Sequence, residues 1–77
     1  MIMNDEYFFS EKKDKSLTVR EKQVLILLCQ GYTNKQIGKY LDISSHTAKA
    51  HVCSILQKLD AKDRVQAAVK AVRLGLV

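Results

Sequence analysis

The apolar residues that follow residue 16 recur at the spacing of an amphipathic α-helix, in four segments separated by short breaks. The first segment begins at Thr18 and carries Glu21 three residues later. This is the capping-box pattern, in which each side chain binds the backbone amide of the other residue. The segment is expected to end before Gly31, because glycine readily adopts the left-handed conformation that closes many helices. Its inner face is expected to consist of Val24, Leu25 and Leu28.

A second helix is predicted from Thr33, which repeats the capping-box pattern with Gln36. Its apolar residues Ile37 and Leu41 are four positions apart and therefore share one face. Residues 41–43 are predicted to form a tight turn that leads directly into the next helix.

Two further helices complete the pattern. Ser44 is expected to cap a third helix that ends near Leu59, with Ile43 filling the space between the second and third helices. Asp63 and Gln66 form another capping-box pattern, and the fourth helix is expected to end near residues 74–75. The sequence thus predicts an all-α fold of four helices, with a loosely ordered arm over residues 1–16 and a folded domain over residues 17–77.

The third helix has an apolar face and a polar face when successive residues are advanced by 100°. The face expected in the core consists of Ala48, Val52, Ile55, Leu56 and Leu59. The outer face consists of His46, Ala50, Cys53 and Gln57, with Lys49 on one flank, Thr47, Ser54 and Lys58 on the other, and His51 at the edge of the core. Small and polar residues at its centre would let this helix enter a DNA major groove, and an ordinary solvated face is the alternative.

The chemistry of two helices favours DNA binding. Lys49 is the candidate for guanine O6 and N7, and Ala50 for contact with a thymine methyl group. Thr33, Asn34 and Lys35 open the second helix with free backbone amides, a side-chain amide and an ammonium group, which suit a phosphate. This is the division of labour in a helix-turn-helix, where the first helix crosses the DNA backbone and the second enters the groove.

The fourth helix is apolar over more of its surface than one contact with the core requires. The excess forms an alanine-rich and valine-rich strip of Val65, Ala68, Val69 and Val72. We expect this strip to form a symmetric dimer contact, which would pair two DNA-reading helices. The alternative is a fourth helix that is buried completely within its own domain.

The charge of the chain is concentrated in the predicted domain. Of its 77 residues, those in 1–16 include three Lys against four Asp and Glu, whereas those in 17–77 include ten Lys and Arg against four Asp and Glu. A basic domain suits a polyanion such as double-stranded DNA, although solubilising charge is the alternative. A chain this small has no room for a substrate cavity beside its core, so we expect neither an enzyme nor a small-molecule substrate.

The cysteines and histidines do not suggest a metal site or a catalytic site. Cys29 and Cys53 are 24 residues apart without a CxxC pair, and Cys29 ends an apolar run that predicts burial. His46 and His51 are five residues apart, which does not place both on one metal-binding face. We expect no metal and no cofactor. We see no signal peptide and no apolar span long enough for a membrane, so we expect a cytoplasmic protein.

Residues 17–77 resemble the LuxR-type (NarL-type) helix-turn-helix of bacterial transcription regulators. The resemblance rests on Leu17-Thr18-x-Arg20-Glu21-x-x-Val24-Leu25, Gly31-x-x-Asn34-Lys35-x-Ile37, Ile43-Ser44-x-x-Thr47-x-Lys49-x-His51, Lys58-Leu59, Arg64-x-x-Ala67 and Gly75-Leu76. It implies a four-helix domain, the third helix in the major groove, the fourth helix at a dimer contact, and promoter binding that regulates transcription. It also implies that Thr33, Asn34, Lys35, Thr47 and Lys58 hold phosphates and that Lys49, Ala50 and Cys53 face bases.

Combining residues and resemblance gives two sets of expected DNA contacts. The expected base-reading residues are Lys49, Ala50, Cys53 and His46. The expected phosphate-binding residues are Thr33, Asn34, Lys35, Ser44, Thr47, His51, Lys58 and Arg64.

Three residues depart from what is usual in the family. Cys53 replaces a longer polar or basic residue, so base readout there is expected to differ. Ala48 stands for the usual valine and Gly38 for the usual alanine, and both are expected to loosen packing. A glycine within a helix costs roughly 1 kcal/mol relative to alanine.

Alternatives to a stand-alone regulator remain at this point. The opening residues favour a native start, like that of the short GerE-like members of the family, over an excised output domain. A protein-interaction module that binds another regulator or RNA polymerase would use the arm residues Tyr7, Phe8 and Phe9. A fragment of a sigma factor, which shares the helix-turn-helix, is the alternative within DNA binding.

Overall fold

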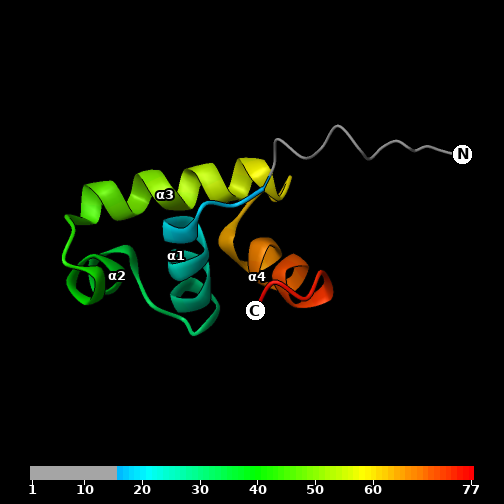
Figure 1. The fold of residues 1–77 in the computed structure, drawn as a ribbon, viewed down its shortest axis with the longest axis horizontal. Coiled ribbons are helices and arrows are strands. Elements are labelled where there is room, and N and C mark those ends of the chain that lie inside the picture. The colour runs from blue at the N-terminus through cyan, green and yellow to red at the C-terminus, as the bar shows by residue number, and fades with distance from the viewer. Residues whose placement is uncertain (1–15) are drawn as a thin grey trace, which may run out of the picture.

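The computed structural model describes residues 16–77, and within that range it contains four α-helices and no strand (Figure 1). The helices are α1 (Val19–Cys29), α2 (Asn34–Leu41), α3 (Ser45–Lys58) and α4 (Arg64–Arg73). The predicted all-α class and the order of the helices are confirmed. The arm expected over residues 1–16, with its three aromatic residues, lies outside the described residues except for Ser16.

The first two helices begin with complete capping boxes. Thr18 Oγ1 accepts from the Glu21 amide at 3.1 Å, and Glu21 Oε1 accepts from the Thr18 amide at 2.9 Å. Thr33 and Gln36 form the same pair of bonds at 3.1 and 2.9 Å. Because these bonds satisfy amides that have no partner within the helix, they fix where each helix begins. Both predicted boxes are confirmed.

The box predicted at the start of α4 is only half correct. Asp63 Oδ1 accepts from the Gln66 amide at 2.8 Å as expected, but Gln66 Oε1 accepts from the amide of Lys62, also at 2.8 Å. The backbone of Asp63 has φ −154°, whereas that of Thr18 has φ −73°. The φ angle sets the direction of a residue's own N–H relative to the helix that follows. The amide of Asp63 therefore does not point at the Gln66 side chain, and the amide of Lys62 donates to Gln66 Oε1 instead.

All four helices end in the same way, at a residue with positive φ. These residues are Gly31 (φ 90°), Asp42 (59°), Asp60 (55°) and Gly75 (71°). In each case the next amide donates to the carbonyl five residues before it: Tyr32 to Leu27, Ile43 to Gly38, Ala61 to Leu56, and Leu76 to Ala71, at 2.8–3.1 Å. This is the Schellman closure, and the predicted role of Gly31 is confirmed.

The long helix α3 runs across the other three, and α1, α2 and α4 all lie on one side of it (Figure 1). The largest fully buried side chains are Val24 and Leu25 of α1, Ile37 of α2 and Ile55 of α3. The remaining predicted core residues are either buried (Leu28, Ala48, Val52) or partly buried against the core (Leu41, Ile43, Leu56, Leu59). Three helices packed on one face of α3 leave its opposite face free.

Gly38 has a structural role that corrects the sequence-based expectation. A Cβ atom at this position would lie 2.7 Å from the carbonyl oxygen of Ile43 and 3.2 Å from backbone atoms of Ser44 and Ser45. These atoms form the turn between α2 and α3 and cannot move as a side chain can. Glycine therefore does not loosen this position. It allows the backbone of the turn to approach α2 more closely than an alanine would permit.

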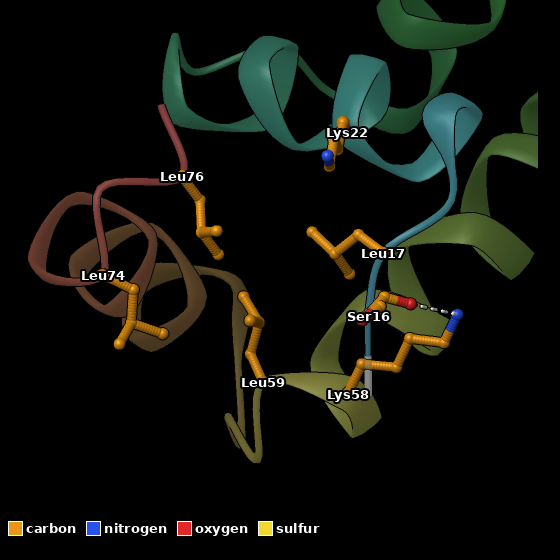
Figure 2. Close-up of a pocket in the computed structure, with 7 residues that line it drawn as sticks. All are labelled: Ser16, Leu17, Lys22, Lys58, Leu59, Leu74 and Leu76. Carbon is orange, nitrogen blue, oxygen red and sulfur yellow. Dashed lines mark hydrogen bonds between the residues drawn. The ribbon is translucent and has the colours of Figure 1, made fainter. Parts of the chain in front are cut away.

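Four leucines line a hollow between the segment before α1, the end of α3 and the segment after α4 (Figure 2). They are Leu17 before α1, Leu59 at the end of α3, and Leu74 and Leu76 after α4. Lys58 Nζ donates to the carbonyl oxygen of Ser16 at 3.3 Å across the rim of this hollow. Lys70 of α4 donates to the carbonyl oxygens of Leu59 and Asp60, in the turn after α3, at 3.2 and 2.7 Å. Lysine side chains thus connect the end of α3 to the segment before α1 and to α4.

Candidate nucleic-acid interface

The face of α3 that points away from the other helices is open to solvent. All four residues predicted to read bases, His46, Lys49, Ala50 and Cys53, are exposed. On the opposite face, Ala48 and Ile55 are fully buried and Val52 is 6% exposed. The predicted division of α3 into an inner and an outer face is therefore confirmed, and contact of the outer face with bases stays a prediction.

The first turn of α2 presents several hydrogen-bond donors. The amides of Asn34 and Lys35 are the first two of the helix and have no acceptor within it. The hydroxyl of Thr33 accepts from the Gln36 amide, and its proton remains available for a further acceptor. Lys35 is exposed and Asn34 half-buried. These groups supply the donors and the positive helix end that a phosphate requires.

The first turn of α3 uses one hydroxyl internally and leaves another for a ligand. Ser44 Oγ accepts from the Thr47 amide at 2.9 Å and donates to Thr47 Oγ1 at 3.0 Å. The Ser44 hydroxyl proton is thus occupied, whereas the exposed Thr47 hydroxyl keeps its own proton. Of these two predicted phosphate contacts, Thr47 is the one with a free donor.

A buried carboxylate joins α1 to α3. Glu21 is 5% exposed, and its Oε2 accepts from the Ser54 hydroxyl at 2.6 Å. Its Oε1 forms an ion pair with Lys58 Nζ at 2.8 Å in addition to the bond from the Thr18 amide. Ser54 and Lys58 are four positions apart, so both reach the same side of α3. The cluster thus links α1 to α3 by polar side chains, beside the apolar core that the two helices share.

The hydrogen bonds of this cluster keep Glu21 ionised. Burial alone would raise the pKa of Glu21, because it disfavours a charge. The bonds from Lys58, Ser54 and the Thr18 amide, together with the positive charge of Lys58, outweigh burial and lower the pKa to about 2. At neutral pH the carboxylate is therefore charged and balanced by Lys58.

A second connection joins α4 to the start of α2. Arg64 is the first residue of α4, and its Nη1 donates to the carbonyl oxygen of Tyr32 at 3.0 Å. Its Nη2 donates to Asn34 Oδ1 at 2.6 Å. Arg64 and Asn34 are both half-buried. The guanidinium thus spans from the fourth helix to the predicted phosphate-binding turn.

These two connections give two of the predicted phosphate ligands partners within the fold. Lys58 and Arg64 are occupied within the fold, so a DNA phosphate would have to compete with Glu21 for the first and with Asn34 for the second. Direct phosphate binding by either residue stays a prediction. His51, another predicted phosphate ligand, is half-buried at the edge of the outer face.

The outer strip of α4 is accessible, as the sequence predicts. Val65, Val69 and Val72 are 71%, 46% and 65% exposed, and Ala68 is half-buried. Val69, Val72 and Ala68 line a shallow depression together with Arg73. The inner face of the same helix buries Ala67 and Ala71 completely. The alternative of a completely buried fourth helix is therefore wrong, and the partner of the strip stays a prediction.

The cysteines differ in their surroundings. Cys29 is partly buried against the core, and this burial raises the pKa of its thiol, whereas Cys53 is exposed on α3. Among residues 16–77, no group of three or more His, Cys, Asp or Glu side chains is arranged to hold a metal ion. None of the helices in the same range combines the length and the apolar character needed to cross a bilayer.

From the sequence, Glu21 is expected only in a helix cap, and its contacts with Ser54 and Lys58 of α3 emerge from the structure. One signal was available, since Ser54 and Lys58 are spaced i, i+4 on the flank of α3 that carries Thr47. The periodicity of the helix places that flank beside the face predicted to meet DNA. The bond between Arg64 and Asn34 had no comparable local signal, because it joins the first residues of two helices that are 30 residues apart.

Comparison with known proteins agrees with this architecture. The family described as "Bacterial regulatory proteins, luxR family" matches residues 15–71. The solved structure of the transcription factor GerE superimposes with a TM-score of 0.72 at 38% sequence identity, covering 78% of this chain and 90% of that chain.

Similar curated proteins are considerably longer than this chain. The transcriptional regulatory protein LiaR of Bacillus subtilis is 52% identical over 63 residues, which cover 82% of this chain and 30% of that protein. The transcriptional regulatory protein DegU of Brevibacillus brevis is 49% identical over 61 residues, which cover 79% of this chain and 26% of that protein. The aligned region thus spans less than a third of either relative. From the match to residues 15–71 and the GerE-like arrangement of its four helices, this chain belongs to the LuxR family of bacterial regulatory proteins.

Proposed function

We propose that this chain regulates transcription by binding promoter DNA, as a homodimer, with the outer face of α3 in the major groove. The observation that carries the proposal is the free face of α3. Three helices pack against one side of it, and the other side exposes small and polar residues around Lys49. A helix in this arrangement can enter a groove without a change in the fold.

The donors beside α3 support the same mode of binding. The first turn of α2 offers the amides of Asn34 and Lys35, the ammonium group of Lys35 and the hydroxyl of Thr33, and Thr47 offers a further hydroxyl. Contacts of this kind hold a protein on the phosphate backbone, while base edges are read by the inserted helix. Bacterial promoter DNA lies in the cytoplasm, which is therefore the proposed site of action.

The exposed valines of α4 support a two-fold symmetric dimer. An apolar strip on a small monomer is a candidate for self-association, because burial of Val65, Val69 and Val72 would remove them from water. A symmetric dimer would present two copies of α3 to two half-sites related by a two-fold axis.

A second surface supports a protein partner in addition to DNA. Ile26 and Tyr40 are 45% and 64% exposed, and together with Gln23, Leu27 and Leu41 they line a shallow apolar depression between α1 and α2. We propose this surface for contact with RNA polymerase or another regulator while α3 holds DNA. A domain that binds only such a protein, without DNA, is the competing function.

Selection of bound duplexes from a random DNA pool at about 0.15 M salt tests the proposal, since nonspecific binding weakens as salt rises. Enrichment of a two-fold symmetric motif is the expected result and would give the half-site spacing directly. A single, unrepeated half-site would retain DNA binding and contradict the dimer. Failure to enrich any sequence would contradict the proposal and favour the protein-binding alternative.

A further inference from the structure

The guanidinium of Arg64 determines which way the side chain of Asn34 faces. Its Nη2 lies 2.6 Å from Asn34 Oδ1, and its Nη1 holds the carbonyl oxygen of Tyr32 at 3.0 Å. An arginine side chain has five N–H donors and no acceptor. The atom of Asn34 that faces Arg64 must therefore be its oxygen, because a reversed amide would set N–H groups against each other.

The consequence concerns the other half of the same amide. With its oxygen bound to Arg64, Asn34 directs its NH2 group away from the guanidinium. Asn34 is also the first residue of α2, where the helix end is positive and the backbone amides are free. A DNA phosphate accepts hydrogen bonds and cannot donate them, so the NH2 group is the useful end of this side chain.

We propose that Arg64 is a positioning residue for DNA binding: it orients Asn34 so that the asparagine NH2 group donates to a phosphate, and it does not bind a phosphate itself. This inference rests on the proposed function and adds a role to a residue that was expected to contact DNA directly. Arg64 also connects the proposed dimer contact with the proposed DNA contact. Arg64 begins the helix that carries the dimer strip and ends at the turn that holds the DNA backbone.

The salt dependence of the DNA affinity distinguishes this positioning role from direct phosphate binding by Arg64. A cation that neutralises a phosphate releases a counterion, so its loss lowers the salt slope, which is the magnitude of the fall in log K per unit of log salt, by about 0.9. Loss of a positioning residue weakens binding but leaves the number of neutralised phosphates, and hence the slope, unchanged. Lys35→Ala serves as the matched control, because Lys35 is exposed and belongs to the same turn.

The experiment measures the affinity of the whole chain for its selected duplex at several salt concentrations. The variants are Arg64→Met, Asn34→Ala, the double variant and Lys35→Ala, and the folded fraction of each is measured by thermal unfolding without DNA. Arg64→Met and Asn34→Ala are each expected to weaken binding roughly 10- to 150-fold, which corresponds to the loss of one hydrogen bond to a charged acceptor. The double variant is expected to bind no more weakly than Asn34→Ala, and only Lys35→Ala is expected to lower the salt slope.

Asn34→Asp gives a test that does not depend on the stability of the Arg64 variant. Aspartate keeps an oxygen acceptor for Arg64 and adds an ion pair, so the domain is expected to melt at the same temperature or higher. A carboxylate has no proton to donate and repels a phosphate, so DNA binding is expected to fall by at least about 10-fold.

Two results would overturn the inference while leaving the proposed function intact. One is a lower salt slope for Arg64→Met with losses that add to those of Asn34→Ala, because this would assign a phosphate to Arg64. The other is full DNA affinity in Asn34→Asp. If the unaltered chain does not bind any duplex, the proposed function itself fails and the inference fails with it.

Discussion

Glu21 on α1 and Lys58 on α3 form an ion pair of 2.8 Å although 37 residues separate them in the chain. Ser54 completes the cluster from one turn earlier on α3, at 2.6 Å from the same carboxylate. The helix proposed to read DNA is thereby tied through two of its side chains to a charged group on α1. The stability of the domain and the proposed placement of α3 on DNA are therefore both expected to depend on this buried carboxylate.

Acid is expected to unfold the domain partly through Glu21. Its pKa is about 2 in the fold and 4.5 in its ordinary state, so the folded form favours the ionised carboxylate. The resulting stabilisation is complete above about pH 4.5 and is lost as the pH falls towards 2. It amounts to roughly 3 kcal/mol at neutral pH. Urea unfolding at a series of pH values, monitored by circular dichroism, measures how the free energy of unfolding depends on pH.

Glu21→Gln is the variant that tests the source of the acid dependence. It leaves Lys58 without its partner and is expected to lower the free energy of unfolding at pH 7 by about 2–3 kcal/mol. Its stability is also expected to change less between pH 4.5 and 2 than that of the unaltered chain. Ser54→Ala, which removes one bond and retains the charge, is the control and should keep the steep dependence. If the stability of Glu21→Gln fell as steeply with pH as that of the unaltered chain, the acid dependence could not be assigned to Glu21.

Gly38→Ala is expected to destabilise the domain despite the better helix propensity of alanine. Alanine gains about 1 kcal/mol in a helix. The added methyl group would lie 2.7 Å from the carbonyl oxygen of Ile43, and relief of that overlap requires the α2–α3 turn to move. Overpacking of this kind costs typically about 1–3 kcal/mol, so the net effect is expected to be a loss of up to about 2 kcal/mol.

Chemical denaturation measures the stability of Gly38→Ala, and DNA affinity reports the position of α3. Lys39→Ala is a suitable control, since Lys39 is the next residue on α2 and is exposed. It should change stability by less than about 0.5 kcal/mol. A more stable Gly38→Ala with unchanged DNA affinity would show that the turn has room for a side chain.

Local features of this domain could be predicted from the sequence because their causes are local. Thr18 and Thr33 each bond within three residues, Gly31 closes its own helix, and the 100° advance alone separates Ala48 from Ala50. Such features depend on one helix at a time. The exposure of the predicted base-reading residues follows from the same periodicity.

The features that escaped prediction depend on how the helices cross. Glu21 reaches Lys58 only when α1 and α3 cross as observed, and Arg64 reaches Asn34 only when α4 and α2 do, and no short pattern specifies those crossings. Helix propensity alone predicts that Gly38 loosens its helix, whereas its role arises from the turn that approaches it. For the same reason, the periodicity of α3 alone does not show that Ser54 and Lys58 on its flank also bind Glu21.

Lys49 and Lys35 are expected to contribute to DNA binding in different ways. Both are exposed. Lys49→Ala should relax sequence preference at one position of each half-site, with a cost of about 1–3 kcal/mol for the preferred base. Lys35→Ala should weaken binding to all sequences and lower the salt slope by about one. Competition binding with a panel of single-base variants, repeated at three salt concentrations, distinguishes them. The same uniform loss for both variants would eliminate Lys49 as a base reader.

Charged residues in the valine strip of α4 are expected to separate the dimer without unfolding the domain. Val65 and Val72 are 71% and 65% exposed, so glutamates at these positions remain in water in the monomer and enter an apolar contact only in the dimer. Because a symmetric contact contains each residue twice, Val65→Glu with Val72→Glu is expected to weaken self-association by at least about 10-fold. Val19→Glu is the matched control, since Val19 is a 75% exposed valine on α1.

Sedimentation over a range of concentrations measures self-association, and binding to single and paired half-sites measures its effect on DNA affinity. The double variant should keep its affinity for one half-site and lose the additional affinity for two. An unaltered chain that stays monomeric and binds paired half-sites no better than single ones would rule out the α4 dimer.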